Sequence, residues 1–275
     1  MEWSKLKNVI LLMLLCVNVI LLLLVSSQES RDHRYQDETL QAALEVLEKG
    51  GITFGLAKVP EDLSLPTVTV TRDRESEASV ATALLGEVTL QGENEVRPRY
   101  SGPGGTAEFS MNGSFSITLA PGTWTRESGQ DYEKASQACL EAIGFSGTLD
   151  SSDLNGSEAV LTYCQNWEGS PLFSCTARLT WDGDNLIQVE GQRLAAAEQS
   201  SSSSTLLSTP TILVQFLAGI NEGGYECSRI DAMASGYLAS SSTTRQVHLT
   251  PVWRFITDTG TYYVNAVTGE FTPLK

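Results

Sequence analysis

The sequence opens with an apolar run that decides where the rest of the chain can fold. Residues 9–25 contain no charged side chain and a single polar interruption, Asn18. A helix of about 17 residues spans about 25 Å, slightly less than a bilayer's hydrocarbon core, so flanking residues must supply the missing turn. Trp3, Lys5 and Lys7 are placed to anchor this helix at the membrane interface. We therefore predict a single N-terminal transmembrane helix.

The charges beside this run set its expected orientation. Lys5 and Lys7 precede it, so the positive-inside rule predicts residues 1–8 as a cytoplasmic stub and the bulk of the chain as extracytoplasmic. A cleavable signal peptide is the alternative, but its apolar region usually has about 7–15 residues, and residues 25–28 make a poor cleavage site. We expect an uncleaved, single-pass protein of the cell membrane, with residues 26–36 as a polar tether.

Asn18 is a candidate contact residue within the membrane. Its amide lies near the middle of the apolar run, where an unsatisfied polar group is costly. A facing helix can satisfy it, and such interhelical hydrogen bonds contribute about 1 kcal/mol. A hydrogen bond within its own helix is the other interpretation.

The composition is that of a folded extracytoplasmic portion, and its charge argues against one class of partner. The 275 residues are 41% hydrophobic, enough for apolar cores, and the formal net charge of −15 argues against nucleic acid as the main partner.

The sequence contains no recognisable metal or catalytic motif. With two histidines and no CxxC pair, a metal site of the usual spacing is not expected. No P-loop, Rossmann fingerprint, nucleophile elbow or HExxH motif occurs, and a catalytic triad would need His33 or His248. We therefore assign no catalytic, cofactor-binding or metal-binding residue.

Cys164 and Cys175 flank a turn signal at residues 168–171. A two-residue hairpin loop of Gly169 and Ser170 would place the cysteines opposite each other, which would allow a disulfide. An extracytoplasmic location permits a disulfide but does not require one. The other interpretation, which we prefer, is two small apolar strand residues.

Apolar periodicity predicts helices, each followed by a run of strands. The main helices are expected at 39–49, 131–143 and 209–221, with a further one near 75–85. Alternating segments predict strands, including a hairpin across Asn112-Gly113 and a final antiparallel pair of 247–257 with 261–264. Repetition of a helix and an antiparallel strand meander indicates an α+β fold. We expect three such units, at 37–126, 127–198 and 208–275, with the Ser-rich residues 199–207 as a linker.

Both ends of the sequence resemble the YycI family, membrane-anchored regulators of an essential Gram-positive two-component system. At the N-terminus the likeness rests on Met1-Glu-Trp-Ser-Lys-Leu-Lys and the lone Asn18, followed after a helix by Ile52-Thr-Phe-Gly and Val59-Pro-Glu. At the C-terminus, Pro251-Val-Trp-Arg-Phe and Tyr262-Tyr-Val-Asn-Ala-Val-Thr-Gly-Glu resemble the family's closing strand pair, a pattern shared with PepSY-like domains.

The resemblance implies a non-enzymatic role without a cofactor. YycI proteins and their YycH partners contact a sensor histidine kinase and adjust its activity, which influences cell-wall metabolism. The expected partners are therefore such a kinase, a YycH-like sister regulator and the membrane. An anchored module that binds a peptide or wall fragment through a sheet edge is the alternative, and an anchored hydrolase is a third possibility.

Overall fold

The structure is a computed structural model that describes residues 13–14, 17–18, 37–55, 59–60, 62–73, 76–91, 97–127, 129–241 and 246–274. The expected interface residues Trp3, Lys5 and Lys7 and the tether at 26–36 lie outside these ranges. Of the expected transmembrane helix only four residues are described; Asn18 is one of them, with helical backbone and an exposed side chain. No helix in the described ranges combines the length and apolarity needed to cross a membrane.

The described residues form four helices and a sheet of 15 strands. The helices are 37–49, α2 (Ser76–Leu85), α3 (Tyr132–Ala142) and α4 (Thr209–Gly223). The strands are β1 (Thr53–Phe54), β2 (Thr67–Arg72), β3 (Thr89–Gln91), β4 (Arg99–Gly102), β5 (Gly105–Phe109), β6 (Ser114–Leu119), β7 (Gly147–Asn155), β8 (Glu158–Trp167), β9 (Ser170–Asp182), β10 (Asn185–Gln192), β11 (Ala196–Ser202), β12 (Arg229–Ser241), β13 (Gln246–Thr257), β14 (Thr261–Asn265) and β15 (Phe271–Pro273). All four expected helices are confirmed, with ends shifted by at most two residues.

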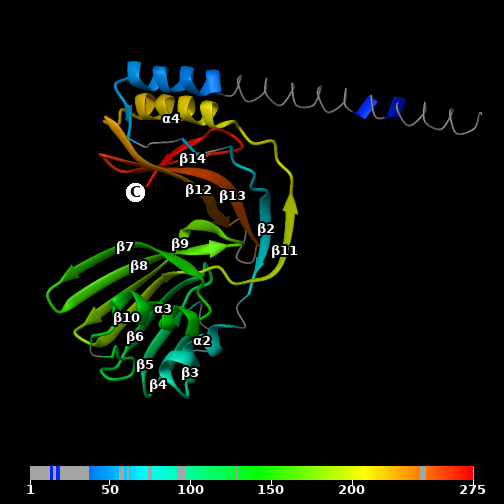
Figure 1. Cartoon of the computed structure of the whole chain (residues 1–275). Coiled ribbons are helices and arrows are strands. Elements are labelled where there is room, and N and C mark those ends of the chain that lie inside the picture. Colours follow the sequence, from blue (N-terminus) through cyan, green and yellow to red (C-terminus); the bar gives the residue numbers. More distant parts are fainter. Residues whose placement is uncertain are drawn as a thin grey trace, which may run out of the picture.

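The sheet runs through both halves of the molecule in the order β11-β2-β13-β12-β9-β10-β6-β5-β4-β3 (Figure 1). Most neighbours are antiparallel, and the two halves meet where β12 and β9 pair in parallel at Tyr237 and Leu172. Gly236 allows this approach, because a Cβ there would lie 2.4 Å from the carbonyl oxygen of Pro171. The chain is thus a mixed fold of helices and mostly antiparallel strands, as expected.

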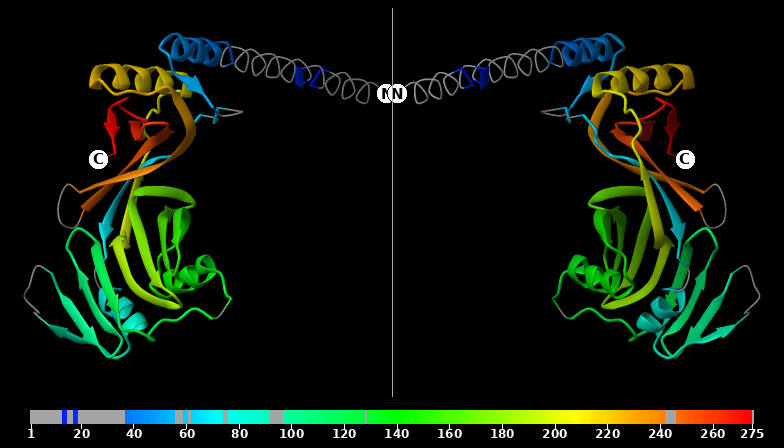
Figure 2. Two further views of the ribbon diagram at one scale, coloured as in Figure 1. Left: turned by 90° about the vertical axis from the view of Figure 1, so that its left-hand side faces the viewer. Right: turned by 90° about the vertical axis from the view of Figure 1, so that its right-hand side faces the viewer.

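Two large apolar cores lie at opposite ends of this sheet, and two smaller apolar clusters lie between them. In the lower half, α2 and α3 pack against strands β4–β6 and β8–β10, around residues such as Ile117 and Trp181. In the upper half, the 37–49 helix and α4 lie side by side over β12–β14 (Figures 1 and 2). The upper core contains Ala43, Leu47, Ile52, Val59, Ile212, Leu213, Phe216, Leu217, Ile220, Ile230, Met233, Trp253, Phe255, Tyr262, Val264 and Ala266.

The expected unit at 37–126 is therefore wrong as a single packing unit. Its first helix joins the upper core, whereas α2 and the strands after it join the lower core. An apolar helix stripe requires a buried partner surface, but its spacing carries no information about which surface that is. Here α4 and the C-terminal strands supply it.

The two predicted hairpins are confirmed. Phe109 pairs with Phe115 across the Asn112-Gly113 turn, where Gly113 adopts a φ of +87°. In the final antiparallel pair, Trp253 faces Val264.

The cysteine hairpin differs from the expected register by one residue. The loop residues are Glu168 and Gly169, both at positive φ, so Trp167 pairs with Ser170. A β-bulge after Cys164 then places this residue opposite Thr176 instead of Cys175. Neighbouring strand residues point to opposite faces, and the two cysteines lie in different apolar clusters as free thiols. The disulfide interpretation is therefore wrong, and both behave as small apolar strand residues.

The Ser-rich segment is only partly a connection. Its first residues belong to β11, which pairs antiparallel with β2 from Thr67↔Ser202 to Arg72↔Ala196. Backbone pairing to β2 overrides the weak strand propensity of serine, because strand formation depends strongly on tertiary context. The interpretation of 199–207 as a linker is therefore wrong for its first half.

Candidate functional site: a groove at the open edge of the sheet

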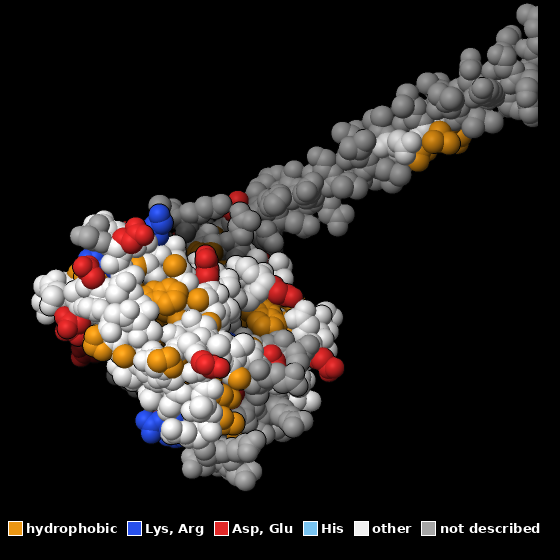
Figure 3. Space-filling view, turned by 90° about the horizontal axis from the view of Figure 1, so that it is seen from below, with side chains coloured by type: hydrophobic (Ala, Val, Ile, Leu, Met, Phe, Trp, Pro, Cys, Tyr) orange, Lys and Arg blue, Asp and Glu red, His pale blue; other side chains and the backbone are white. Residues whose placement is uncertain are grey.

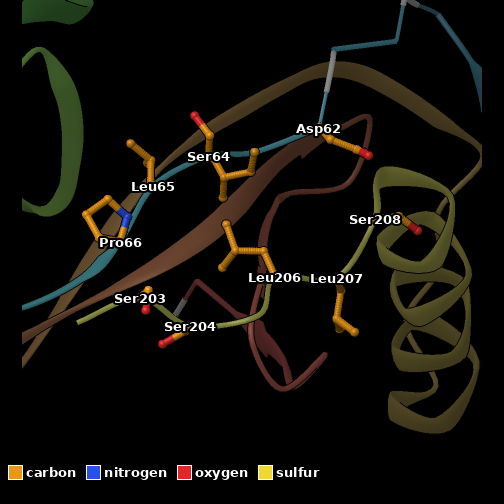
Figure 4. Close-up of a pocket in the computed structure, with 10 residues that line it drawn as sticks. Asp62, Ser64, Leu65, Pro66, Ser203, Ser204, Leu206, Leu207 and Ser208 are labelled. Carbon is orange, nitrogen blue, oxygen red and sulfur yellow. The ribbon is translucent and has the colours of Figure 1, made fainter. Parts of the chain in front are cut away.

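A groove forms where β2 and β11 separate. Their ladder ends at Thr67 and Ser202, and the adjoining segments 62–66 and 203–208 diverge around a cavity of about 450 Å³. Pro66 directly precedes β2; proline has no backbone N–H to donate, so it suits the first position before a ladder. Figure 4 shows the two segments as facing walls of the groove.

Side-chain hydrogen bonds close both ends of the groove. At one end, the hydroxyls of Thr67 and Ser204 lie 3.0 Å apart and share a hydrogen bond. At the other end, the backbone N–H of Thr209 donates to the carboxylate of Asp62 at 2.7 Å. The walls are therefore held together although no ladder hydrogen bonds join them at the centre.

Each wall is also fixed to the strands behind it. The phenol of Tyr237, on β12, donates to the carbonyl of Pro66 at 3.1 Å, and the N–H of Leu207 donates to the carbonyl of Ala266 at 2.8 Å. Burial raises the pKa of Tyr237, and the charge of Glu168 raises it further. The phenol therefore stays protonated at neutral pH and keeps its donor.

The lining combines leucine side chains with hydroxyl groups and one carboxylate. Leu206 lies between the walls, with Leu65 on the facing segment (Figure 4). The described residues that line the groove are Asp62, Leu63, Ser64, Leu65, Pro66, Ser203, Ser204, Leu206, Leu207 and Ser208. Among these described residues there is no histidine, lysine or arginine, and the one carboxylate, Asp62, accepts from the Thr209 N–H. This chemistry suits binding of an apolar side chain beside hydrogen-bonding groups.

The positive end of α4 is already neutralised at this site. Ser208 is the N-cap, but its side chain makes no capping hydrogen bond; instead it pairs with the hydroxyl of Thr211 at 3.0 Å. The Asp62 carboxylate takes over the capping role and complements the helix dipole. A second anion would be repelled here, so the groove favours neutral or cationic ligands.

The groove continues into an open sheet edge. Strand β11 ends the strand order, and within the described ranges its outer side pairs with no other strand. Side chains from Glu198 to Ser202 are exposed, and the Gln199 amide donates to Glu168 at 2.9 Å. The edge therefore offers unpaired backbone groups flanked by two carboxylates.

The residues predicted from sequence do not form this groove. Asn18, Cys164 and Cys175 are absent from its lining, and Trp3, Lys5 and Lys7 lie outside the described residues. His248, the strand histidine, shares a hydrogen bond with Thr69 at 3.0 Å. Within the described ranges, no cluster of three or more His, Cys, Asp or Glu side chains could hold a metal ion.

Comparisons with known proteins give no family. No family model and no curated protein matches the sequence. An uncharacterized protein from Eubacterium rectale ATCC 33656 aligns at TM-score 0.48 and 10% identity, covering 82% of this chain and 91% of its own. The Bacillus megaterium YpeB C-terminal domain aligns at TM-score 0.41 and 12% identity, covering 74% of this chain and 99% of its own. Both similarities are too low to assign a fold family or a function.

Proposed function

We propose that this protein is a membrane-anchored extracytoplasmic regulator that contacts a sensor histidine kinase of a two-component system and modulates its activity, thereby influencing cell-wall metabolism. The proposal includes a YycI-type identity, a PepSY-like closing unit and a YycH-like sister regulator as second partner. Its sequence support is the resemblance at both ends of the chain, which includes the expected anchor.

The structural observation that supports the proposal best is the position of the 37–49 helix. This helix follows the expected anchor and tether, and its Leu47 side chain is only 1% exposed within the upper core. The helix ends at Lys49, and a Cβ at the following Gly50 would lie 2.8 Å from the side chain of Leu217 in α4, so the two helices are closely packed here. A displacement of the anchor would therefore act on α4 and the C-terminal strands. This arrangement suits a protein that transmits a conformational change between the membrane and its extracytoplasmic domain.

The membrane contact is proposed to include Asn18. An amide in the apolar run gains a partner only from a polar group on a facing helix or on its own helix. The anchor is therefore proposed as part of the kinase interface.

Co-purification of the full-length protein with the candidate kinase tests this proposal. We expect Asn18→Leu to weaken association about five- to thirtyfold, which corresponds to about 1–2 kcal/mol. Val17→Leu is the matched control, because it changes an adjacent residue without removing a polar group. A replaced anchor that keeps full association would show that the extracytoplasmic part carries the contact. Failure of the wild type to bind any kinase would contradict the regulator proposal.

The second candidate function is an anchored module that binds a peptide or wall fragment. The groove and the open edge of β11 favour it, because both offer hydrogen-bonding groups beside apolar surface.

A further inference from the structure

We propose that β11 and the adjoining groove bind an extended, basic segment of a partner protein, which adds to the sheet as a further strand. The inference deepens the proposed function, on which it rests for the presence of a protein partner. Strand addition gains affinity from backbone hydrogen bonds and specificity from alternate side chains. The open edge, the groove and the local charge each support this occupant.

The edge of β11 is protected at its start, by Glu198 and a β-bulge between Ala196 and Glu198, and is open beyond it. Sheet edges are normally blocked by charged side chains, proline or covering segments. Residues 199–202 are one glutamine and three serines, all exposed. The other long open edge, β7, carries Asp150 and Asp153 instead, and Asp150 is engaged in an ion pair with Arg254 at 2.8 Å. Between these two edges, β11 is the better template for an added strand.

The groove supplies a place for an apolar side chain of the added strand. It begins directly after Ser202, where β2 leaves the ladder. Side chains of a strand alternate between faces, so every second residue of a bound segment can lie on the groove side. A side chain at the end of the segment would contact Leu65 and Leu206. An apolar residue there is therefore part of the expected recognition pattern.

The local charge selects a basic segment. Glu198 lies within the edge strand, Glu168 lies beside it, and Asp62 closes the groove. Neither β11 nor the described part of the groove lining contains Lys or Arg. The whole chain has a formal net charge of −15, and Asp and Glu side chains are also spread over the lower face (Figure 3). Electrostatic attraction favours Lys or Arg in the partner, whereas two copies of this acidic chain repel each other.

Binding of designed peptides to the full-length protein in detergent micelles tests the proposal. The probe is a peptide of alternating Lys and Val, and the controls are a Glu-Val peptide and a Lys-Val peptide with a central proline. We expect the Lys-Val probe to bind, to bind more weakly at high salt and to slow hydrogen exchange of β11 amides. Both controls should bind at least about tenfold more weakly, through charge repulsion or lost hydrogen bonds.

Adjacent proline substitutions locate the binding edge. Backbone N–H groups alternate between the two sides of a strand, so only one of Ser200 and Ser201 donates outward. The outward variant, Ser200→Pro or Ser201→Pro, should keep its thermal stability and lose about tenfold in probe affinity. The other variant should lose stability, because it breaks pairing with β2. The matched controls Ser151→Pro and Ser152→Pro in β7 should not change probe affinity.

Three results with the purified protein would overturn the inference: no binding of the Lys-Val probe, binding that neither β11 proline weakens, or self-association that the outward proline abolishes. The last result would make a second copy the occupant. Kinase association that survives the outward proline would also overturn it, while leaving the proposed function intact. Edge binding of the probe without any kinase association would contradict the proposed function and leave this inference intact.

Discussion

The two halves of the molecule are assembled in different ways. The lower half is built from one continuous stretch, α2 to β10, whose helices pack against strands that are close in sequence. The upper half joins the 37–49 helix to α4 and the C-terminal strands, so its core depends on both ends of the described chain. Local sequence order therefore describes the lower half well and the upper half poorly. Because the 37–49 helix belongs to the upper half, this half is the part that follows the expected anchor and tether.

The junction between the halves combines two small apolar clusters with polar side-chain contacts. The side chain of Gln165 exchanges two hydrogen bonds with the backbone of Leu194, at 2.8 and 2.9 Å. The Arg193 guanidinium donates to the Ser76 hydroxyl at 2.8 Å, and its pKa is lowered by burial. Such contacts fix orientation and contribute less stability than apolar burial. We therefore expect the two cores to respond separately to substitutions.

The largest expected effect comes from Phe216→Ala in the upper core. Phe216 is fully buried and stacks on Phe255 with ring centroids 4.3 Å apart. Its truncation should cost about 3–5 kcal/mol. Thiol labelling during urea unfolding should show Cys227, beside the upper core, reacting at lower urea while Cys139 in the lower core stays protected. Simultaneous exposure of both thiols would show that the halves unfold as one unit.

The next effect tests whether the 37–49 helix belongs to the upper core. Leu47→Ala should cost about 2–5 kcal/mol in urea unfolding, because a buried leucine leaves a cavity. Glu48→Ala, at an exposed position in the same helix, should change stability little. Equal stabilities of the two variants would contradict packing of this helix against α4.

Alkaline pH should destabilise the lower half through its buried thiol. Burial raises the pKa of Cys139 to about 12 from its ordinary value of 9.0, so the unfolded chain loses this proton first. The stabilisation is complete below pH 9 and is lost as pH rises toward 12, by about 1 kcal/mol at pH 10. Cys139→Ala should show a shallower loss of stability between pH 8 and about 10, measured by urea unfolding. An unchanged slope would contradict burial of this thiol.

The smallest effect concerns the groove. Asp62→Ala removes the carboxylate that accepts from the Thr209 N–H, and should cost about 1 kcal/mol. Ser64→Ala, in the same wall, is the matched control and should be nearly neutral. A loss in the control as large as in Asp62→Ala would show that the helix cap is not the cause.

Sequence patterns predicted the local features and failed on those set by distant contacts. Helix spacing and the Asn112-Gly113 turn act within a few residues, so these elements were predictable. Strand β11 was not, because pairing with β2 rather than serine propensity holds it in the sheet. The prediction for the cysteine hairpin failed because the turn lies one residue earlier than expected and because the register shifts between Cys164 and Gln165, which leaves residues 173–175 of β9 without partners in this ladder. The groove escaped prediction because its walls lie far apart in sequence, although Pro66 beside a strand and the serine run mark its two sides.

Site-specific photocrosslinking in intact membranes tests the central claim most directly, that a partner protein docks on the open edge of β11. A photoreactive residue is placed at Ser200 in β11 or at Ser152 in β7, and the full-length protein is produced together with the candidate kinase. We predict a crosslink to the kinase from position 200 and none from position 152. Crosslinking from position 152 alone, or from neither position while the two proteins still co-purify, would contradict docking at this edge.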